Sequence, residues 1–154
     1  MKLTEKQAAW VNETLDRMAK KMEKVRERSA EKIPYDTLNG IHADKSDEKN
    51  ISWWTNGFWG GMMWQMFTLT GQERYKEIAQ WNEEKLDTCF LHFDMLDHDN
   101  GFKWLPTAVA DYRVTGNERS KKARTAGGGD TGRTLQPCRE IYSRLERLGR
   151  PQGG

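Results

Sequence analysis

Apolar residues concentrate between residues 51 and 115, and their spacing predicts two kinds of helix. Residues 58–69 are apolar nearly all round, which predicts a helix that is buried on every side. Residues 72–92 keep Glu and Lys on one face and apolar side chains on the other, which predicts an outer amphipathic helix. Residues 3–29 carry apolar side chains at three- and four-residue spacings and predict one long helix. Residues 31–50 have no such period and contain Pro and an Asn-Gly pair, so they predict a loop.

Turn and capping residues mark the ends of these predicted helices. Thr4, followed three residues later by Gln7, gives the pattern of a capping box. Gly71 and Gly116 each follow an apolar segment, where a helix commonly ends on a residue in the left-handed conformation. The large apolar side chains of the first buried helix are expected in the core: Met62, Met63, Trp64, Met66, Phe67 and Leu69.

Two stretches of the chain match each other in order. One reads "NGFWGGMMWQMFTLTGQER" from residue 56, and the other reads "NGFKWLPTAVADYRVTGNER" from residue 100. The Asn-Gly-Phe triplets are 44 positions apart, and the Thr-Gly pairs at 70 and 115 are 45 positions apart. Chance turn chemistry is the alternative, but the order and spacing of the matches favour a repeat of helical hairpins. In such an array the turns before the buried helices open on one face.

The turns before the two repeated helices carry different side chains. The first, "WWTNGF" at residues 53–58, contributes tryptophans to a chain that has seven of them, an unusually high number. An indole such as Trp54 is a natural platform for the apolar face of a sugar, although core packing is the commoner role of Trp. The second, "LDHDNGF" at residues 96–102, places Asp99 beside His98. Asp99 is either the general acid or base of an enzyme or only the N-cap of a helix.

Charge and composition argue against several classes of protein. The 154-residue chain has a net charge of only +2 with Lys and Arg interspersed with Glu, so no nucleic-acid partner is expected. No apolar run approaches about 18 residues, so no membrane span is expected. The acids and histidines at residues 92–99 match no established ligand spacing, and no metal site is predicted. Cys89 and Cys138 form no CxxC pair and the N-terminus lacks a secretory segment, which indicates a reduced cytoplasmic setting.

The matched stretches resemble one known family of enzymes. Between about Trp10 and Ala126, the order of "WWTNGFWGG", "LDHDNGF" and the two Thr-Gly turns is similar to that of glycoside hydrolase family 88, the unsaturated glucuronyl hydrolases. The resemblance implies an all-α fold, an (α/α)6 toroid of helical hairpins that would be incomplete in this chain. It also implies action on oligosaccharides that end in a 4,5-unsaturated uronic acid, by hydration of the C4=C5 double bond, with no cofactor.

The resemblance assigns roles to particular residues of this chain. It places a catalytic role on Asp99 and substrate contacts on Trp54, His98 and Asn56. The proton donor of the family, an aspartate in an Ile-Asp-Cys motif, has no counterpart in this sequence. Two alternatives therefore stay open. One is a carbohydrate-binding fragment without catalysis, and the other is a helical-repeat fragment that docks another protein.

Residues 127–154 differ in character from the rest of the chain, because Gly and Arg dominate and no apolar period continues. Reading the degenerate codons of residues 129–148 one base forward permits V-I-L-A-G-R-F-N-P-A-G-K-F-I-R-A-W-N-D, which resembles the continuation of the family. We therefore hypothesise that residues 1–126 are the N-terminal portion of the toroid and that residues 127–154 are translated out of frame and poorly structured. An incomplete ring leaves apolar helices uncovered, which predicts self-association.

Overall fold

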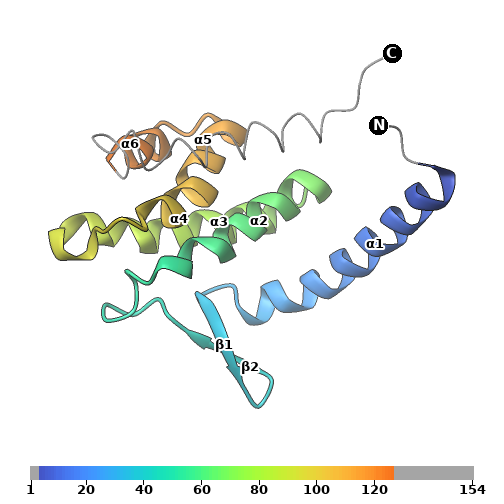
Figure 1. The fold of residues 1–154 in the computed structure, drawn as a ribbon, viewed down its shortest axis with the longest axis horizontal. Helices are drawn as coiled ribbons and strands as arrows, with labels where there is room; N and C mark the ends of the chain where they lie inside the picture. Colours follow the sequence, from blue (N-terminus) through green and yellow to red (C-terminus); the bar gives the residue numbers. More distant parts are fainter. Residues whose placement is uncertain (1–3, 127–154) are drawn as a thin grey trace.

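The computed structural model describes residues 4–126, and the regular elements in this range are helices apart from one β-hairpin (Figure 1), which confirms the predicted all-α class. The helices and strands are α1 (Glu5–Arg28), β1 (Pro34–Leu38), β2 (Ile41–Asp44), α2 (Gly57–Thr70), α3 (Glu73–Leu86), α4 (Asn100–Trp104), α5 (Ala110–Thr115) and α6 (Glu118–Ala126). Short 3₁₀ turns cover Trp54–Asn56, Asp87–Leu91 and Phe93–Met95, and a π-helical turn covers Leu105–Val109. The closed toroid stays a prediction, as does the division at residue 126, beyond which the predicted tail lies outside the described residues.

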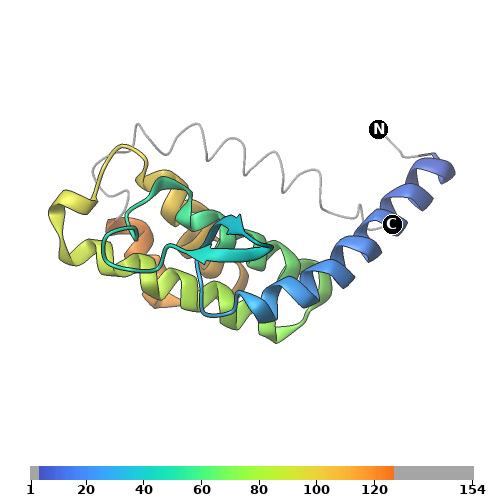
Figure 2. The same cartoon turned by 90° about the horizontal axis from the view of Figure 1, so that it is seen from below.

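Helix α1 begins at the predicted capping box. The Gln7 backbone N–H donates to Thr4 Oγ1 at 3.3 Å, and the Thr4 backbone N–H donates to Gln7 Oε1 at 2.9 Å. The C-terminal half of α1 packs on the core through Met22 and Val25, which are partly buried. Its N-terminal half extends past the other helices in both views (Figures 1 and 2), and Trp10 there is 63% exposed. The apolar stripe of α1 is therefore covered over only part of its length.

The segment predicted as a loop contains a β-hairpin, so that prediction is wrong. β1 and β2 pair in antiparallel fashion, with Leu38 opposite Ile41. The two residues between them, Asn39 and Gly40, both have positive φ, at 52° and 75°. Two successive residues of positive φ make the type of turn whose twist matches that of two antiparallel strands. The Asn-Gly pair therefore acts here as a hairpin turn, whereas the sequence reading treated it only as a breaker.

Helices α2 and α3 form the first hairpin, and α4, α5 and α6 form the second. Each hairpin has its glycine turn as predicted, because Gly71 and Gly116 have φ of 68° and 75° and close the preceding helix. The second hairpin departs from the prediction of a regular inner helix. Pro106, which has no backbone N–H to donate, lies within the π-helical turn that separates α4 from α5. None of the described helices combines the length and the apolar character needed to cross a membrane.

The core lies between α2, α3 and the second hairpin. Its two apolar clusters contain Trp59, Met63, Trp64, Met66, Tyr75, Ile78, Ala79 and Ala110 in one, and Ile33, Ile51, Leu86, Cys89, Trp104, Ala108 and Ala123 in the other. The expectation that all large residues of α2 are in the core is wrong for Met62 and Leu69, which are 45% and 48% exposed. Within the described chain, neighbouring elements do not surround α2, and this leaves part of its apolar surface exposed.

Candidate functional site

The two Asn-Gly-Phe turns lie side by side, and Gly57 is the point of contact. A Cβ atom added to Gly57 would lie 2.4 Å from the carbonyl oxygens of both Phe102 and Lys103. Since real Cβ atoms do not approach backbone so closely, only glycine permits this contact. The structure thus brings together the two turns that the sequence repeat relates, although 44 positions separate them along the chain.

An exposed cluster of three aromatic rings covers the junction of the two turns. Trp54 lies 5.7 Å from Phe58 and 5.6 Å from Phe102 between ring centroids, and Phe58 lies 6.1 Å from Phe102. All three contacts are edge-to-face, and the three side chains are 39%, 41% and 42% exposed. We call this cluster the aromatic platform. The sequence reading identified Trp54 but missed both phenylalanines, although their repetition in the matched triplets was the available signal.

Asp99 precedes α4, directly beside the platform. Its backbone carbonyl accepts from the Phe102 N–H at 2.9 Å, whereas its carboxylate makes no capping bond to the helix. The Asp99 side chain is 30% exposed, and its Oδ2 lies 3.5 Å from Nε2 of His98, which is 88% exposed. The Asp99 N–H in turn donates to Asp97 Oδ1 at 2.9 Å. The alternative of a side-chain helix cap therefore does not describe Asp99, and its carboxylate is partly exposed next to an imidazole.

Asn56 occupies a different environment from the other predicted site residues. Its side chain is buried, and its Nδ2 donates to the carbonyls of Asn50 at 2.9 Å and Ile51 at 3.0 Å. The backbone carbonyl of Asn56 accepts from Asn82 Nδ2 at 3.2 Å, and Asn82 Oδ1 accepts from the Gly60 N–H at 3.1 Å. Asn56 thus ties the loop before α2 to α3. This geometry gives Asn56 a role in the interior. Its expected contact with a substrate stays a prediction.

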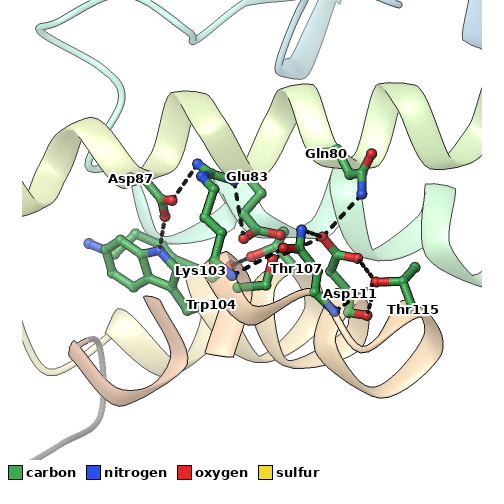
Figure 3. Close-up of polar contacts among 11 residues, drawn as sticks. Gln80, Glu83, Asp87, Lys103, Trp104, Thr107, Asp111 and Thr115 are labelled. Atoms are coloured by element: carbon green, nitrogen blue, oxygen red, sulfur yellow. Dashed lines mark hydrogen bonds and ion pairs between the residues drawn. The ribbon is translucent and has the colours of Figure 1, made fainter. Parts of the chain in front are cut away.

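A second group of polar side chains lies where α3 meets the second hairpin. Figure 3 shows Asp87, Glu83 and Asp111 in a row between these elements. Asp111 is buried and accepts from four donors: Thr115 Oγ1 at 2.6 Å, Asn117 Nδ2 at 2.8 Å, Ser120 Oγ at 2.9 Å and Gln80 Nε2 at 3.3 Å. Despite these acids, no group of three or more His, Cys, Asp or Glu within residues 4–126 is placed to hold a metal ion.

Burial raises the pKa of two acids in this group. Glu83 is fully buried, and desolvation raises its pKa to about 7, against the opposing effects of Ser120 and of Arg119, whose Nη1 lies 3.5 Å from Oε1. Burial also raises the pKa of Asp87, although this carboxylate accepts from Trp104 Nε1 at 3.0 Å and from Arg119 Nη2 at 2.6 Å. The sequence reading missed both acids. Glu83 follows Tyr75 and Ala79 at four-residue intervals, so its place on a buried stripe was readable.

About half of the chain matches curated hydrolases. Over 71 residues, 46% of this chain and 18% of the relative, it is 34% identical to the unsaturated chondroitin disaccharide hydrolase of Streptococcus pneumoniae. Over 70 residues, 45% of this chain and 19% of the relative, it is 37% identical to the unsaturated glucuronyl hydrolase of Bacillus sp. (strain GL1). These matches confirm the resemblance to the unsaturated glucuronyl hydrolases. The chain spans about a fifth of the length of these relatives. No family model and no solved structure matches it.

Proposed function

We propose that residues 4–126 supply the sugar-binding surface, and one acid–base group, of a glycosidase that acts on 4,5-unsaturated uronic acids. The contact at Gly57 supports this proposal, because it joins the turn that follows Trp54 to the turn of Phe102, whose N–H donates to the Asp99 carbonyl. The substrate class follows from the names of the relatives, which include hydrolases of unsaturated chondroitin disaccharide and an unsaturated glucuronyl hydrolase. An indole and two phenyl rings suit the apolar face of a pyranose.

In the proposed reaction a proton adds to C4 and a water oxygen bonds to C5 of the unsaturated sugar. The resulting hemiketal then opens and releases the rest of the oligosaccharide. Asp99 is suited to orient or deprotonate the attacking water, because its carboxylate is partly exposed and lies 3.5 Å from the His98 ring. The proton delivered to C4 requires a second acid. In the family that this chain resembles, the second acid is the aspartate of the Ile-Asp-Cys motif, which this sequence lacks.

The missing proton donor favours a second candidate function for the chain as it stands, a carbohydrate-binding fragment without turnover. The two functions differ in one measurement. An unsaturated chondroitin disaccharide that quenches Trp fluorescence, while its conjugated double bond keeps its ultraviolet absorbance, indicates binding alone. Loss of that absorbance indicates the enzyme. Neither effect, together with self-association through exposed residues such as Met62 and Leu69, indicates a fragment that docks protein instead.

We also propose that residues 127–154, outside the described structure, are translated out of frame. Sequencing the coding DNA across codons 120–155 tests this directly. The expected result is a sequence whose reading one base forward continues with the Leu-Ala-Gly-Arg-Phe-Asn pattern. A coding sequence in which that forward reading is interrupted or does not resemble the family contradicts the proposal.

The catalytic role of Asp99 is tested in a chain whose reading frame has been restored. Asp99→Asn is expected to lower kcat by about two orders of magnitude or more, because the amide cannot accept a proton from water. Asp94→Asn is the matched control, since Asp94 is an exposed acid of the same loop. The measurement is the loss of ultraviolet absorbance of an unsaturated disaccharide. Near-normal turnover by Asp99→Asn reduces this residue to a structural part of the loop.

A further inference from the structure

Lys103 is a fully buried lysine next to the surface described above. It occupies the position after the second Asn-Gly-Phe triplet, and the matched position after the first triplet is Trp59, which is 3% exposed. Lysine is almost never fully buried unless its ammonium group is paired. Here Nζ donates to the carbonyl of Ser52 at 3.2 Å and to that of Met95 at 3.1 Å, and it lies 3.7 Å from Asp97 Oδ1. Two carbonyls thus accept hydrogen bonds from the ammonium group, and the Asp97 carboxylate forms an ion pair with it.

These acceptors belong to the two loops that build the proposed site. Ser52 immediately precedes the tryptophan pair of the aromatic loop, residues 53–58. Met95 and Asp97 belong to residues 92–99, which we call the acid loop. The same Oδ1 of Asp97 that faces Lys103 also accepts the Asp99 N–H at 2.9 Å. A single ammonium group therefore holds the start of one loop and, through Asp97, the backbone of the residue that carries the proposed acid–base group.

We propose that Lys103 is a positioning residue that fixes the aromatic loop relative to the acid loop, so that Trp54 and Asp99 contact the same sugar. This inference rests on the proposed function for its ligand. Lys103 touches no substrate in this account, because its side chain is wholly enclosed. Its effect passes through Ser52 on one side and Asp97 on the other. Small displacements of such groups lower binding and turnover steeply, since the reacting atoms must meet within a narrow geometry.

The first test uses the full 154-residue chain without ligand. Lys103→Met keeps an unbranched side chain of similar length but removes all three donors, and Lys49→Met is the control at an exposed lysine. In amide hydrogen exchange, Lys103→Met is expected to accelerate exchange at least about 10-fold in both loops while the α2–α3 core keeps its rates. Unchanged loops, a change in only one loop, or uniform acceleration over the whole chain overturns the inference, because uniform acceleration is a loss of global stability.

Asp97→Asn provides a second variant in case Lys103→Met does not fold. It removes the charge that faces Lys103 but keeps an Oδ1 that can accept the Asp99 N–H, and the buried lysine keeps both of its carbonyl partners. Faster exchange at the Asp99 amide, with unchanged exchange in the aromatic loop, is expected. No change at Asp99 overturns the proposed route through Asp97.

The second test measures binding of an unsaturated chondroitin disaccharide by Trp fluorescence. Lys103→Met is expected to weaken binding about 10-fold or more, whereas Lys49→Met leaves it unchanged. Trp54→Phe and Asp99→Asn should have coupled effects on affinity in the native chain and additive effects in the Lys103→Met background. If the native chain binds and Lys103→Met binds equally well, the inference fails and the proposed function stands. If the native chain does not bind the disaccharide, the proposed function fails, and the exchange result alone decides whether Lys103 holds the two loops.

Discussion

In the first hairpin, α2 and α3 close over apolar side chains such as Met63 and Tyr75, whereas in the second hairpin α5 and α6 meet at Asp111 and Ser120. Both inner helices nevertheless end on the same Thr-Gly pair with a glycine in the left-handed conformation. The repeated Thr-Gly pairs thus determine where each inner helix ends and the chain turns. The side chains between the turns determine what each hairpin buries, and there the two copies have diverged.

The difference makes the two hairpins complementary rather than interchangeable. A Cβ atom added to Gly61 of α2 would lie 2.6 Å from Cβ of Pro106, so α2 lacks a side chain where the second hairpin carries its proline. Likewise Gly57 has no Cβ where the second Asn-Gly-Phe turn presents two carbonyl oxygens. The first hairpin therefore provides a surface of glycines that accepts the irregular backbone of the second.

Gly57→Ala gives the largest expected effect and breaks the contact between the two hairpins. The free energy of unfolding should fall by roughly 3 kcal/mol or more, because the new methyl group meets backbone that cannot move away independently. Gly71→Ala is the control, since no atom lies within 4 Å of its added Cβ and only its φ of +68° is unfavourable. That control should cost about 1 kcal/mol in urea unfolding. Equal losses for the two variants contradict the close contact.

Glu83→Gln tests the buried acids that lie where α3 meets the second hairpin. The folded-state pKa of Glu83, about 7, is above its ordinary value of 4.5, so the folded protein holds this proton more tightly than the unfolded chain. Its contribution to stability is therefore complete below pH 4.5 and is lost as the pH rises through 7, by at most about 3 kcal/mol. Glu83→Gln should remove this loss, and the exposed neighbour change Glu84→Gln should retain it. If the unfolding free energies of the native protein and of Glu83→Gln depend on pH in the same way, the raised pKa is not that of Glu83.

Thr115→Val and Thr70→Val compare the matched positions directly and give the smallest expected effect. Thr70 Oγ1 donates to the Met66 carbonyl at 2.7 Å, whereas Thr115 Oγ1 lies 2.9 Å from the Asp111 carbonyl and 2.6 Å from its carboxylate. Loss of a donor to a buried carboxylate should make Thr115→Val more costly by about 1 kcal/mol in thermal or urea unfolding. If Thr70→Val costs as much, the carboxylate adds nothing at this position.

The sequence predicted most helix ends and the adjacency of the two loops more closely than it predicted burial, although the helix predicted over residues 72–92 ends at Leu86. The capping box at Thr4 and the glycine turns were readable because each involves residues only a few positions apart. Asp99 and Trp54 could be singled out as candidates for chemistry from their loops. The exposure of Met62 and the burial of Lys103 were not readable, because a lysine is ordinarily placed in solvent and a methionine in the core.

The amino-acid sequence by itself determined the local geometry of this protein. Side-chain caps and glycines of positive φ act within one turn of the chain, so the identities of these residues are enough to predict where a helix begins or ends. Only the tertiary structure decided which charged groups lie inside. The Lys103 ammonium group is stable in the interior because the carbonyl of Ser52, 51 positions away, is brought within 3.2 Å of it. The pKa of Glu83 is raised because neighbouring helices exclude water from its carboxyl group. Both outcomes depend on desolvation by segments that are remote in sequence.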